Sequence, residues 1–279
     1  MQKIKYPLIV SDFDGTLLRS DDCVAQETKD AIHQYVAQGG RFCLCTGRML
    51  GSILLKANAL GLTGLVSSFQ GSVVADIQTG QVLLDGGLEA SDAAEICRFC
   101  EENDYHTHAY TLNEFYANKN NKALEDYRRI TGIQGSVVDQ EPLWQFVLRK
   151  GEKIRKLLLL VHPHEREKIY QTLQEKFGER FYVTYSAAFL VEISSKEHTK
   201  GTAVQFMAQH YGVQIKDVIA VGDSLNDLPM IESAGLGVAM KNADDALKEI
   251  ADVVLQYSND ENGIGHLIEE IACIGENHD

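Results

Sequence analysis

The sequence predicts an α/β protein: a doubly wound parallel sheet with a second, α+β domain inserted into it. Two observations support this fold class. Short apolar runs alternate with amphipathic helical segments at both ends of the chain, and a different pattern fills the middle. Such alternation is typical of parallel sheets with helices on both faces. With 279 residues, the chain is also longer than a single hydrophobic core usually supports.

The first third of the chain alternates strand and helix signals. A buried strand is expected over residues 8–10 and a helix over residues 26–38, which Gly39 and Gly40 end. The next strand is expected over residues 41–45, and a second amphipathic helix covers residues 53–60. This order favours neighbouring parallel strands with crossover helices.

The middle segment follows another order. A hairpin is expected over residues 73–84. After it we expect helices over residues 91–103, 122–130 and 165–177, and strands over residues 106–109, 114–118, 156–161, 181–185 and 190–193. The alternating pattern returns with a helix from Lys200, a strand over residues 218–221, and later strands over residues 237–240 and 253–255. We therefore place the core domain at residues 1–86 and 189–279, and the inserted cap at residues 87–188.

The net charge of −14 argues against nucleic acid as a partner, because a field of that sign repels phosphate backbones. A site for a phosphorylated molecule would need local positive charge, which a divalent cation supplies. The longest apolar run, residues 157–161, is too short to cross a bilayer, and the amino terminus lacks a secretory signal pattern. Six scattered cysteines suit a reducing compartment. We expect a cytoplasmic monomer or homodimer with no membrane partner.

Acidic residues follow two of the predicted strands. Asp12 and Asp14 come after the first strand, two positions apart, and Gly15 lets the chain turn away. Asp223 and Asp227 follow a later strand with a spacing of four, so that one helical turn can bring them together. Carboxylate oxygens suit magnesium better than zinc. A lone pair such as Asp12 and Asp14 is more often a solvated turn, so only the combination is informative.

Three further positions complete the pattern. Thr46 and Gly47 follow the second strand at the start of a helix, where a hydroxyl and backbone N–H groups can bind phosphate. Lys200 begins the helix after the insert, and Asn226 lies between the two later acids. Taken singly, Thr46 would be a helix cap and Lys200 a surface lysine.

Together these stretches resemble the four motifs of haloacid dehalogenase-like phosphatases. The matching stretches are Asp12-Phe13-Asp14-Gly15-Thr16, Thr46-Gly47-Arg48, Lys200, and Gly222-Asp223-Ser224-Leu225-Asn226-Asp227. The long insert and the stretch at residues 238–243 resemble the Cof-type branch, which carries an α/β cap after the second motif. The resemblance implies a Mg2+-dependent phosphatase for a small phosphorylated metabolite, with a sugar phosphate as the first expectation.

The resemblance also implies a role for each matching residue. Asp12 would be the nucleophile and a magnesium ligand. Asp14 would be the general acid/base and would bind magnesium through its carbonyl. Lys200 would act in catalysis and in phosphate binding. The other roles are phosphate binding by Thr46, the Gly47 amide and Asn226, and magnesium binding by Asp223. Asp227 would bind magnesium through water or would orient Lys200. Cap residues would select the substrate, with Lys119, Asn120, Lys122 and Arg128 as candidates.

Two departures from that family pattern bear on substrate preference. Gln70-Gly71 stands where relatives often carry Asn-Gly, and the segment over residues 194–201 lacks the proline often found before the lysine. Two other functions are considered. A phosphomutase would return the phosphoryl group to its substrate. A non-catalytic phosphosugar sensor would have no need of both Asp12 and Asp14.

Three further patterns are interpreted as structural. Cys97 and Cys100 lie at core spacing on an expected helix, so packing explains them better than redox or metal chemistry. The pairs His106/His108 and His162/His164 lack a nearby carboxylate or cysteine partner in the sequence.

Overall fold

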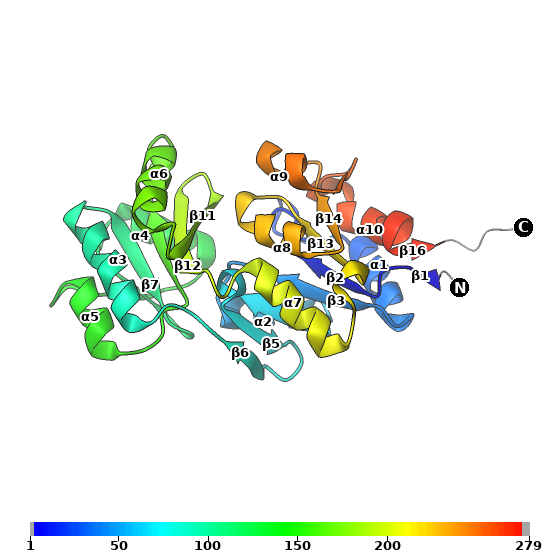
Figure 1. Ribbon diagram of the computed structural model, residues 1–279, viewed down its shortest axis with the longest axis horizontal. Helices are drawn as coiled ribbons and strands as arrows, with labels where there is room; N and C mark the ends of the chain where they lie inside the picture. Colours follow the sequence, from blue (N-terminus) through cyan, green and yellow to red (C-terminus); the bar gives the residue numbers. More distant parts are fainter. Residues whose placement is uncertain (1–2, 275–279) are drawn as a thin grey trace, which may run out of the picture. The chain divides into compact units, whose positions relative to one another are not determined.

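A computed structural model describes residues 3–274 of the chain. They form two compact units. The core unit holds the residues up to Leu84 together with those from Thr199 onward, and the cap unit is Asp85–His198. Both are drawn in Figure 1. Among the described residues, the structure contains no helix with the length and apolar character needed to span a bilayer.

The core unit is built on an eight-stranded sheet with the order β15-β14-β13-β2-β3-β4-β5-β6. The strands are β2 (Leu8–Ser11), β3 (Arg41–Cys45), β4 (Leu65–Ser68), β5 (Val73–Asp76), β6 (Val82–Asp85), β13 (Val218–Gly222), β14 (Leu236–Ala239) and β15 (Val253–Val254). The six strands from β15 to β4 run parallel, and β5 is antiparallel to β4. Because β2 pairs with both β3 and β13, the carboxyl ends of these three strands lie side by side, where open α/β sheets bind ligands.

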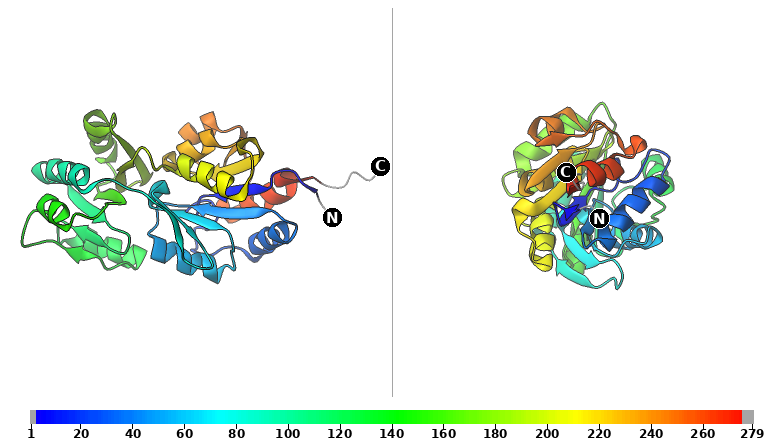
Figure 2. Two further views of the ribbon diagram at one scale, coloured as in Figure 1. Left: turned by 60° about the horizontal axis from the view of Figure 1, so that its bottom comes forward. Right: turned by 90° about the vertical axis from the view of Figure 1, so that its right-hand side faces the viewer.

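Helices cover both faces of the core sheet, as Figure 2 shows. The helices are α1 (Gln26–Ala37), α2 (Leu50–Ala59), α7 (Lys200–Tyr211), α8 (Leu228–Ser233), α9 (Asp245–Ile250) and α10 (Gly263–Leu267). Helices α1 and α10 pack together on one face, and α7 and α8 on the other. Short helical turns η1 (Phe69–Gly71), η2 (Ile215–Asp217), η3 (Leu225–Asp227), η4 (Asn259–Glu261) and η5 (Ile268–Ala272) and a two-stranded ribbon of β1 (Lys3–Ile4) and β16 (Cys273–Ile274) complete the unit. The doubly wound arrangement is as expected.

The cap unit is a six-stranded, mostly antiparallel sheet with the order β11-β12-β10-β7-β8-β9. Its strands are β7 (His106–Tyr110), β8 (Phe115–Ala117), β9 (Ser136–Val137), β10 (Lys156–Leu160), β11 (Phe181–Ala187) and β12 (Leu190–Ser195). Its helices are α3 (Ala90–Glu102), α4 (Lys122–Thr131), α5 (Leu143–Lys150) and α6 (Arg166–Phe177). Alternate residues such as Leu157 and Ile193 belong to one hydrophobic core with α3, α5 and α6. The opposite face carries polar side chains, including Lys156 and Glu192.

The structure corrects the expected cap boundary. We expected the core domain to resume at residue 189, but β12 pairs with β10 and β11, so it belongs to the cap sheet. The cap unit therefore continues to His198. Sequence analysis also gave no prediction for α5 and assigned no bounds to β4.

The cysteine pair behaves as expected. Cys97 and Cys100 are fully buried in the cap core, where they pack with α5 and the sheet. The first histidine pair is buried on β7, with 3.1 Å between the Nε2 atoms of His106 and His108. Burial lowers the pKa of His106 to about 4, so its imidazole is neutral at pH 7.

Candidate active site

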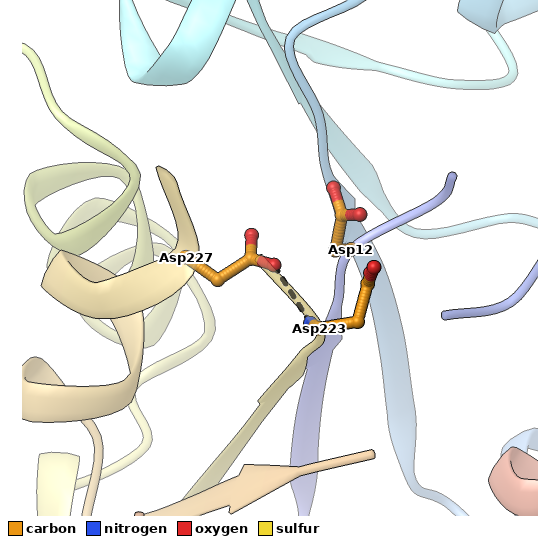
Figure 3. A group of neighbouring side chains, drawn as sticks. All are labelled: Asp12, Asp223 and Asp227. Carbon is orange, nitrogen blue, oxygen red and sulfur yellow. Dashed lines mark hydrogen bonds between the residues drawn. The ribbon is translucent and has the colours of Figure 1, made fainter. Parts of the chain in front are cut away.

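Three carboxylates meet at the carboxyl ends of the central strands. Asp12 follows β2 and Asp223 follows β13, and the Asp12 amide donates to the carbonyl of Val221 at 2.9 Å. Asp227 joins them from η3. One carboxylate oxygen from each of the three acids lies within 4.8 Å of those from the other two, and Figure 3 shows the group. Among residues 3–274, no other cluster of three or more potential metal ligands of the His, Cys, Asp or Glu type is found.

Two glycines allow the acids to lie this close together, because a side chain at either position would clash with one of them. A side chain at Gly222 would place its Cβ 2.5 Å from Cγ of Asp227, and one at Gly15 would lie 2.4 Å from Oδ2 of Asp223. Gly15 also has φ +78°, a conformation that glycine adopts without steric cost. The loop after β13 is then held by Asp227, whose Oδ2 accepts from the amides of Asp223 and Ser224 at 2.9 and 3.1 Å.

Lys200 is the cation of the group. Its side chain is fully buried, and its Nζ lies 2.6 Å from Oδ1 of Asp12 and 2.5 Å from Oδ1 of Asp227. Helix α7 holds it there, because Lys200 is the first helical residue and the hydroxyl of Thr199 caps the helix. One ammonium group therefore faces three carboxylates, which leaves a local excess of negative charge when all are ionised.

This excess shifts the protonation equilibria of the site. Burial, followed by the nearby Asp227 carboxylate, raises the pKa of Asp12 well above its usual value. The same two causes raise the pKa of Asp223 to about 7. For Lys200, burial lowers the pKa, but the carboxylates of Asp12 and Asp227 outweigh it, so the pKa is raised and the ammonium stays charged.

The donor set fits a hard divalent cation. It consists of carboxylate oxygens within a few ångströms of one another, without cysteine or histidine among them. A cation would offset the negative charge that Lys200 alone does not balance. The structure thus brings together three of the four residues that sequence analysis expected to bind magnesium, namely Asp12, Asp223 and Asp227.

Asp14 lies outside this acidic cluster. Its carboxylate is about half exposed and forms a bidentate pair with Arg48, with Nε to Oδ2 at 2.7 Å and Nη2 to Oδ1 at 2.5 Å. The Arg48 guanidinium also lies over the ring of Phe13 at 5.2 Å. Sequence analysis noted Arg48 in its motif but gave it no function, since nothing in the local sequence links it to a residue 34 positions away.

Thr46 and Gly47 follow β3, which is the neighbour of β2 in the sheet. Thr46 is buried directly after β3, and its Oγ1 accepts from the Arg48 amide at 3.2 Å, so it caps the turn locally as well. A Cβ at Gly47 would lie 2.5 Å from Nε2 of Gln70, so the Gln70 side chain would have to shift to admit it. Asn226 is buried and donates through Nδ2 to Oε1 of Gln70 at 3.1 Å.

Two more residues that sequence analysis left without a role support the acidic loops. The hydroxyl of Thr16 donates to Oδ1 of Asp223 at 2.6 Å. Asn242 donates through Nδ2 to the carbonyl of Gly15 at 2.8 Å. Both lie in stretches that resemble the family, which was the only available signal.

The candidate substrate residues of the cap do not form one site. Lys119 and Lys122 line a cavity of about 740 Å³ within the cap unit, together with His106 and Tyr127. Lys119 is already paired with Asp104 at 2.6 Å. Arg128 donates to the carbonyls of residues 134 and 135, which secures the loop after α4, and Asn120 is exposed.

Comparison with known proteins identifies the family. Residues 9–268 match the haloacid dehalogenase-like hydrolase family. YxeH of Bacillus subtilis is 31% identical over 273 residues, covering 96% of this chain and 98% of its own. The 5-amino-6-(5-phospho-D-ribitylamino)uracil phosphatase YwtE of Bacillus subtilis is 29% identical over 284 residues, covering 94% and 97%. The solved structure of a haloacid dehalogenase-like hydrolase from B. subtilis superposes with a TM-score of 0.84 at 26% identity, covering 95% and 99%.

The chain belongs to the haloacid dehalogenase-like hydrolase family. It is a phosphatase, the activity for which its curated relatives are named. This enzyme class argues against the non-catalytic sensor.

Proposed function

We propose that this phosphatase is magnesium-dependent and transfers the phosphoryl group of its substrate to Asp12. The observation that carries the proposal is the buried group of three carboxylates around one ammonium at the carboxyl ends of β2 and β13. Such an excess of buried negative charge is costly unless a cation completes it. A purely structural cluster would more simply pair charges one to one.

Asp12, Asp223 and Asp227, with the backbone carbonyl of Asp14, would hold the ion. A bound magnesium ion supplies charge neutralisation for the carboxylates and the incoming phosphate. Thr46, the Gly47 amide, Asn226 and Lys200 would hold the phosphoryl oxygens. Lys200 then offsets the charge on Asp12 and on the phosphate together, since its Nζ is already in contact with Asp12.

In the proposed chemistry, an Asp12 oxygen attacks phosphorus and the ester oxygen leaves, which forms an aspartyl-phosphate. Asp14 protonates the leaving oxygen and then takes a proton from the water that hydrolyses the intermediate. Both Asp14 oxygens accept hydrogen bonds from Arg48 in the structure. We therefore expect the Asp14–Arg48 pair to open when an anionic substrate offers Arg48 another partner.

A small phosphorylated metabolite is the proposed substrate, with a sugar phosphate as the specific class. The relative YwtE is named for a substrate with a phosphorylated ribityl group, which supports a polyhydroxylated leaving group. The proposal also includes a cytoplasmic location, a monomer or homodimer, and no nucleic acid or membrane partner. Six free cysteines and a net charge of −14 support it. A phosphomutase would give isomerised sugar phosphate in place of free phosphate.

The test is phosphate release by Asp12→Asn with a panel of about a hundred phosphorylated metabolites in magnesium buffer. We expect turnover at least about 10⁴-fold below wild type, because the amide is not a nucleophile. Circular dichroism checks that the fold persists, and Asp30→Asn, an exposed position on α1, is the matched control. Full activity of Asp12→Asn, or of wild-type protein after chelation, would contradict the proposal.

A further inference from the structure

The short turn η1 carries two adjacent residues in an unfavourable backbone conformation. Phe69 has φ +52° and Gln70 has φ +62°, and neither is glycine. A side chain makes this left-handed region sterically unfavourable. Both side chains are fully buried, so the surroundings determine the conformation. Strain of this kind concentrates where a site requires a particular geometry.

The backbone of η1 holds the loop that follows β3. The Phe69 amide donates to the carbonyl of Arg48 at 3.1 Å, and the Gln70 amide donates to the carbonyl of Thr46 at 3.1 Å. The side-chain amide of Gln70 lies against Gly47, close enough that any Cβ there would clash. The left-handed backbone thus directs two consecutive amides into one loop, which is the proposed phosphate-binding loop.

The side chain of Gln70 also orients the side-chain amide of Asn226, a second proposed phosphate-binding group. Its Oε1 accepts from Nδ2 of Asn226 at 3.1 Å, and both residues are buried. A carboxamide has one donor end and one acceptor end. An acceptor fixed beside Nδ2 keeps the donor end of Asn226 in place, and the second hydrogen of the same nitrogen stays available for a phosphoryl oxygen.

The third contact of η1 is with the start of α7. Gly71 has φ +108°, and a Cβ there would lie 2.1 Å from the carbonyl oxygen of Thr199 and 2.7 Å from the amide of Lys200. The turn therefore touches the loop after β3, the loop after β13 and the beginning of the lysine helix. These are the three segments that carry the proposed phosphate-binding groups.

We propose that Gln70 is a positioning residue of the phosphate site, which fixes the Asn226 amide and the loop at Thr46 for phosphate binding. This inference rests on the proposed function, because it takes Asn226 as a phosphate ligand. Gln70 acts through Asn226, so the effect of its substitution depends on the presence of the Asn226 side chain.

The first measurement is the inhibition constant of inorganic phosphate against hydrolysis of p-nitrophenyl phosphate with magnesium. Gln70→Met keeps the length of the side chain and removes the acceptor. We expect the inhibition constant to rise about 5- to 10-fold, the loss that one hydrogen bond produces. An inhibition constant within about twofold of wild type would overturn the inference.

A double-mutant cycle separates positioning from a merely structural role. In the Asn226→Ala background, Gln70→Met should change the inhibition constant by less than about twofold, because the group on which it acts is gone. An equal rise in both backgrounds would show that Gln70 does not act through Asn226, and the inference would be wrong.

Gln70→Asn is a variant that we expect to fold at least as well as the wild-type protein. Asparagine tolerates positive φ better than glutamine, while its shorter side chain withdraws the acceptor from Asn226. We expect an unchanged or higher melting temperature together with weaker inhibition by phosphate. A lower melting temperature with unchanged inhibition would contradict the inference.

The outcomes distinguish this inference from the proposed function. If the wild-type protein hydrolyses no phosphate monoester with magnesium, the proposed function itself is wrong. If the wild-type protein is active and the Gln70 variants behave like it, only the inference about Gln70 is wrong.

Discussion

Each unit of the molecule buries one lysine against carboxylates, and the two sites differ in their charge balance. In the cap unit, Lys156 and Glu192 form an ion pair at 2.7 Å across neighbouring strands, both almost fully buried. In the core unit, Lys200 contacts Asp12 and Asp227, with Asp223 beside them. The cap pair joins one cation to one anion, whereas in the core one cation contacts two acids and a third acid lies beside them.

The difference shows which buried charges point to chemistry. In a matched pair the two charges neutralise each other, and replacement of such a pair by apolar groups of similar volume often causes no loss of stability. In the unmatched set, burial and the neighbouring carboxylates raise the pKa values of Asp12 and Asp223, so that protons or a bound cation balance the charge. A buried lysine therefore indicates a functional site only when the carboxylates around it outnumber it.

The largest expected effect comes from exchanging the two lysines for methionine. Lys200→Met should lower kcat/KM on p-nitrophenyl phosphate by about 10³-fold or more, because Asp12 and the phosphate lose their fixed cation. Lys156→Met should instead lower the free energy of unfolding by about 3–5 kcal/mol, because it removes the cation that pairs with the buried Glu192 carboxylate. Activity assays of both variants give kcat/KM, and urea unfolding gives the free energy of unfolding.

The matched control is the double variant Lys156→Met/Glu192→Leu. It should recover most of the lost stability, since a buried pair is replaced by apolar volume. The pair Lys200→Met/Asp12→Asn should recover no activity. If Lys156→Met/Glu192→Leu were as unstable as Lys156→Met alone, the cap ion pair would not be a replaceable matched pair, and the proposed difference between the two sites would be wrong.

A smaller effect is expected in the dependence of stability on pH. The folded pKa of Asp223 is raised to about 7, and that of Asp12 is also raised, so between about pH 4 and pH 7 the folded protein holds protons that the unfolded chain has released. Without magnesium, the free energy of unfolding should therefore fall as pH rises through that window. Bound magnesium favours the ionised carboxylates and should reverse the loss.

Thermal melts from pH 4.5 to 8, with and without magnesium, test this expectation. Asp223→Asn should lose part of the slope and of the magnesium effect, with differences of about 2–4 °C for each 1 kcal/mol. Glu192→Gln in the cap should keep the magnesium effect. Identical pH curves for wild type and Asp223→Asn would show that the acidic cluster does not titrate as described.

The smallest effect concerns the exposed arginines. Arg48→Lys keeps the charge but loses the bidentate geometry toward Asp14. Because the pair is partly exposed, stability should change by less than about 1 kcal/mol, while KM for p-nitrophenyl phosphate rises. Arg180→Lys, which affects the exposed pairs with Asp92 and Glu95 in the cap, should change stability as little and leave KM unchanged. Equal KM values for Arg48→Lys and wild type would argue against substrate contact by Arg48.

Prediction from sequence was most successful where local pattern and position in the sheet coincide. Asp12 and Asp223 were placed correctly together because each follows a short buried strand, and parallel strand ends share one edge. Helix α5 was missed because its eight residues contain only two buried positions, Leu143 and Val147, too few to show a helical period. Strand β12 was assigned to the wrong domain because its sequence does not reveal the strands with which it pairs.

The sequence by itself was sufficient to predict the fold class, the inserted cap and the carboxylates that meet at the strand ends, because these follow from short-range patterns that repeat in a fixed order. Only the tertiary structure decided which side chains are partners: Arg48 with Asp14, Gln70 with Asn226, and Lys200 with two acids. Residues in these pairs are 27 to 188 positions apart, as for Lys200 with Asp227 and with Asp12. Contacts over such separations depend on how strands and loops pack, and no local propensity encodes them.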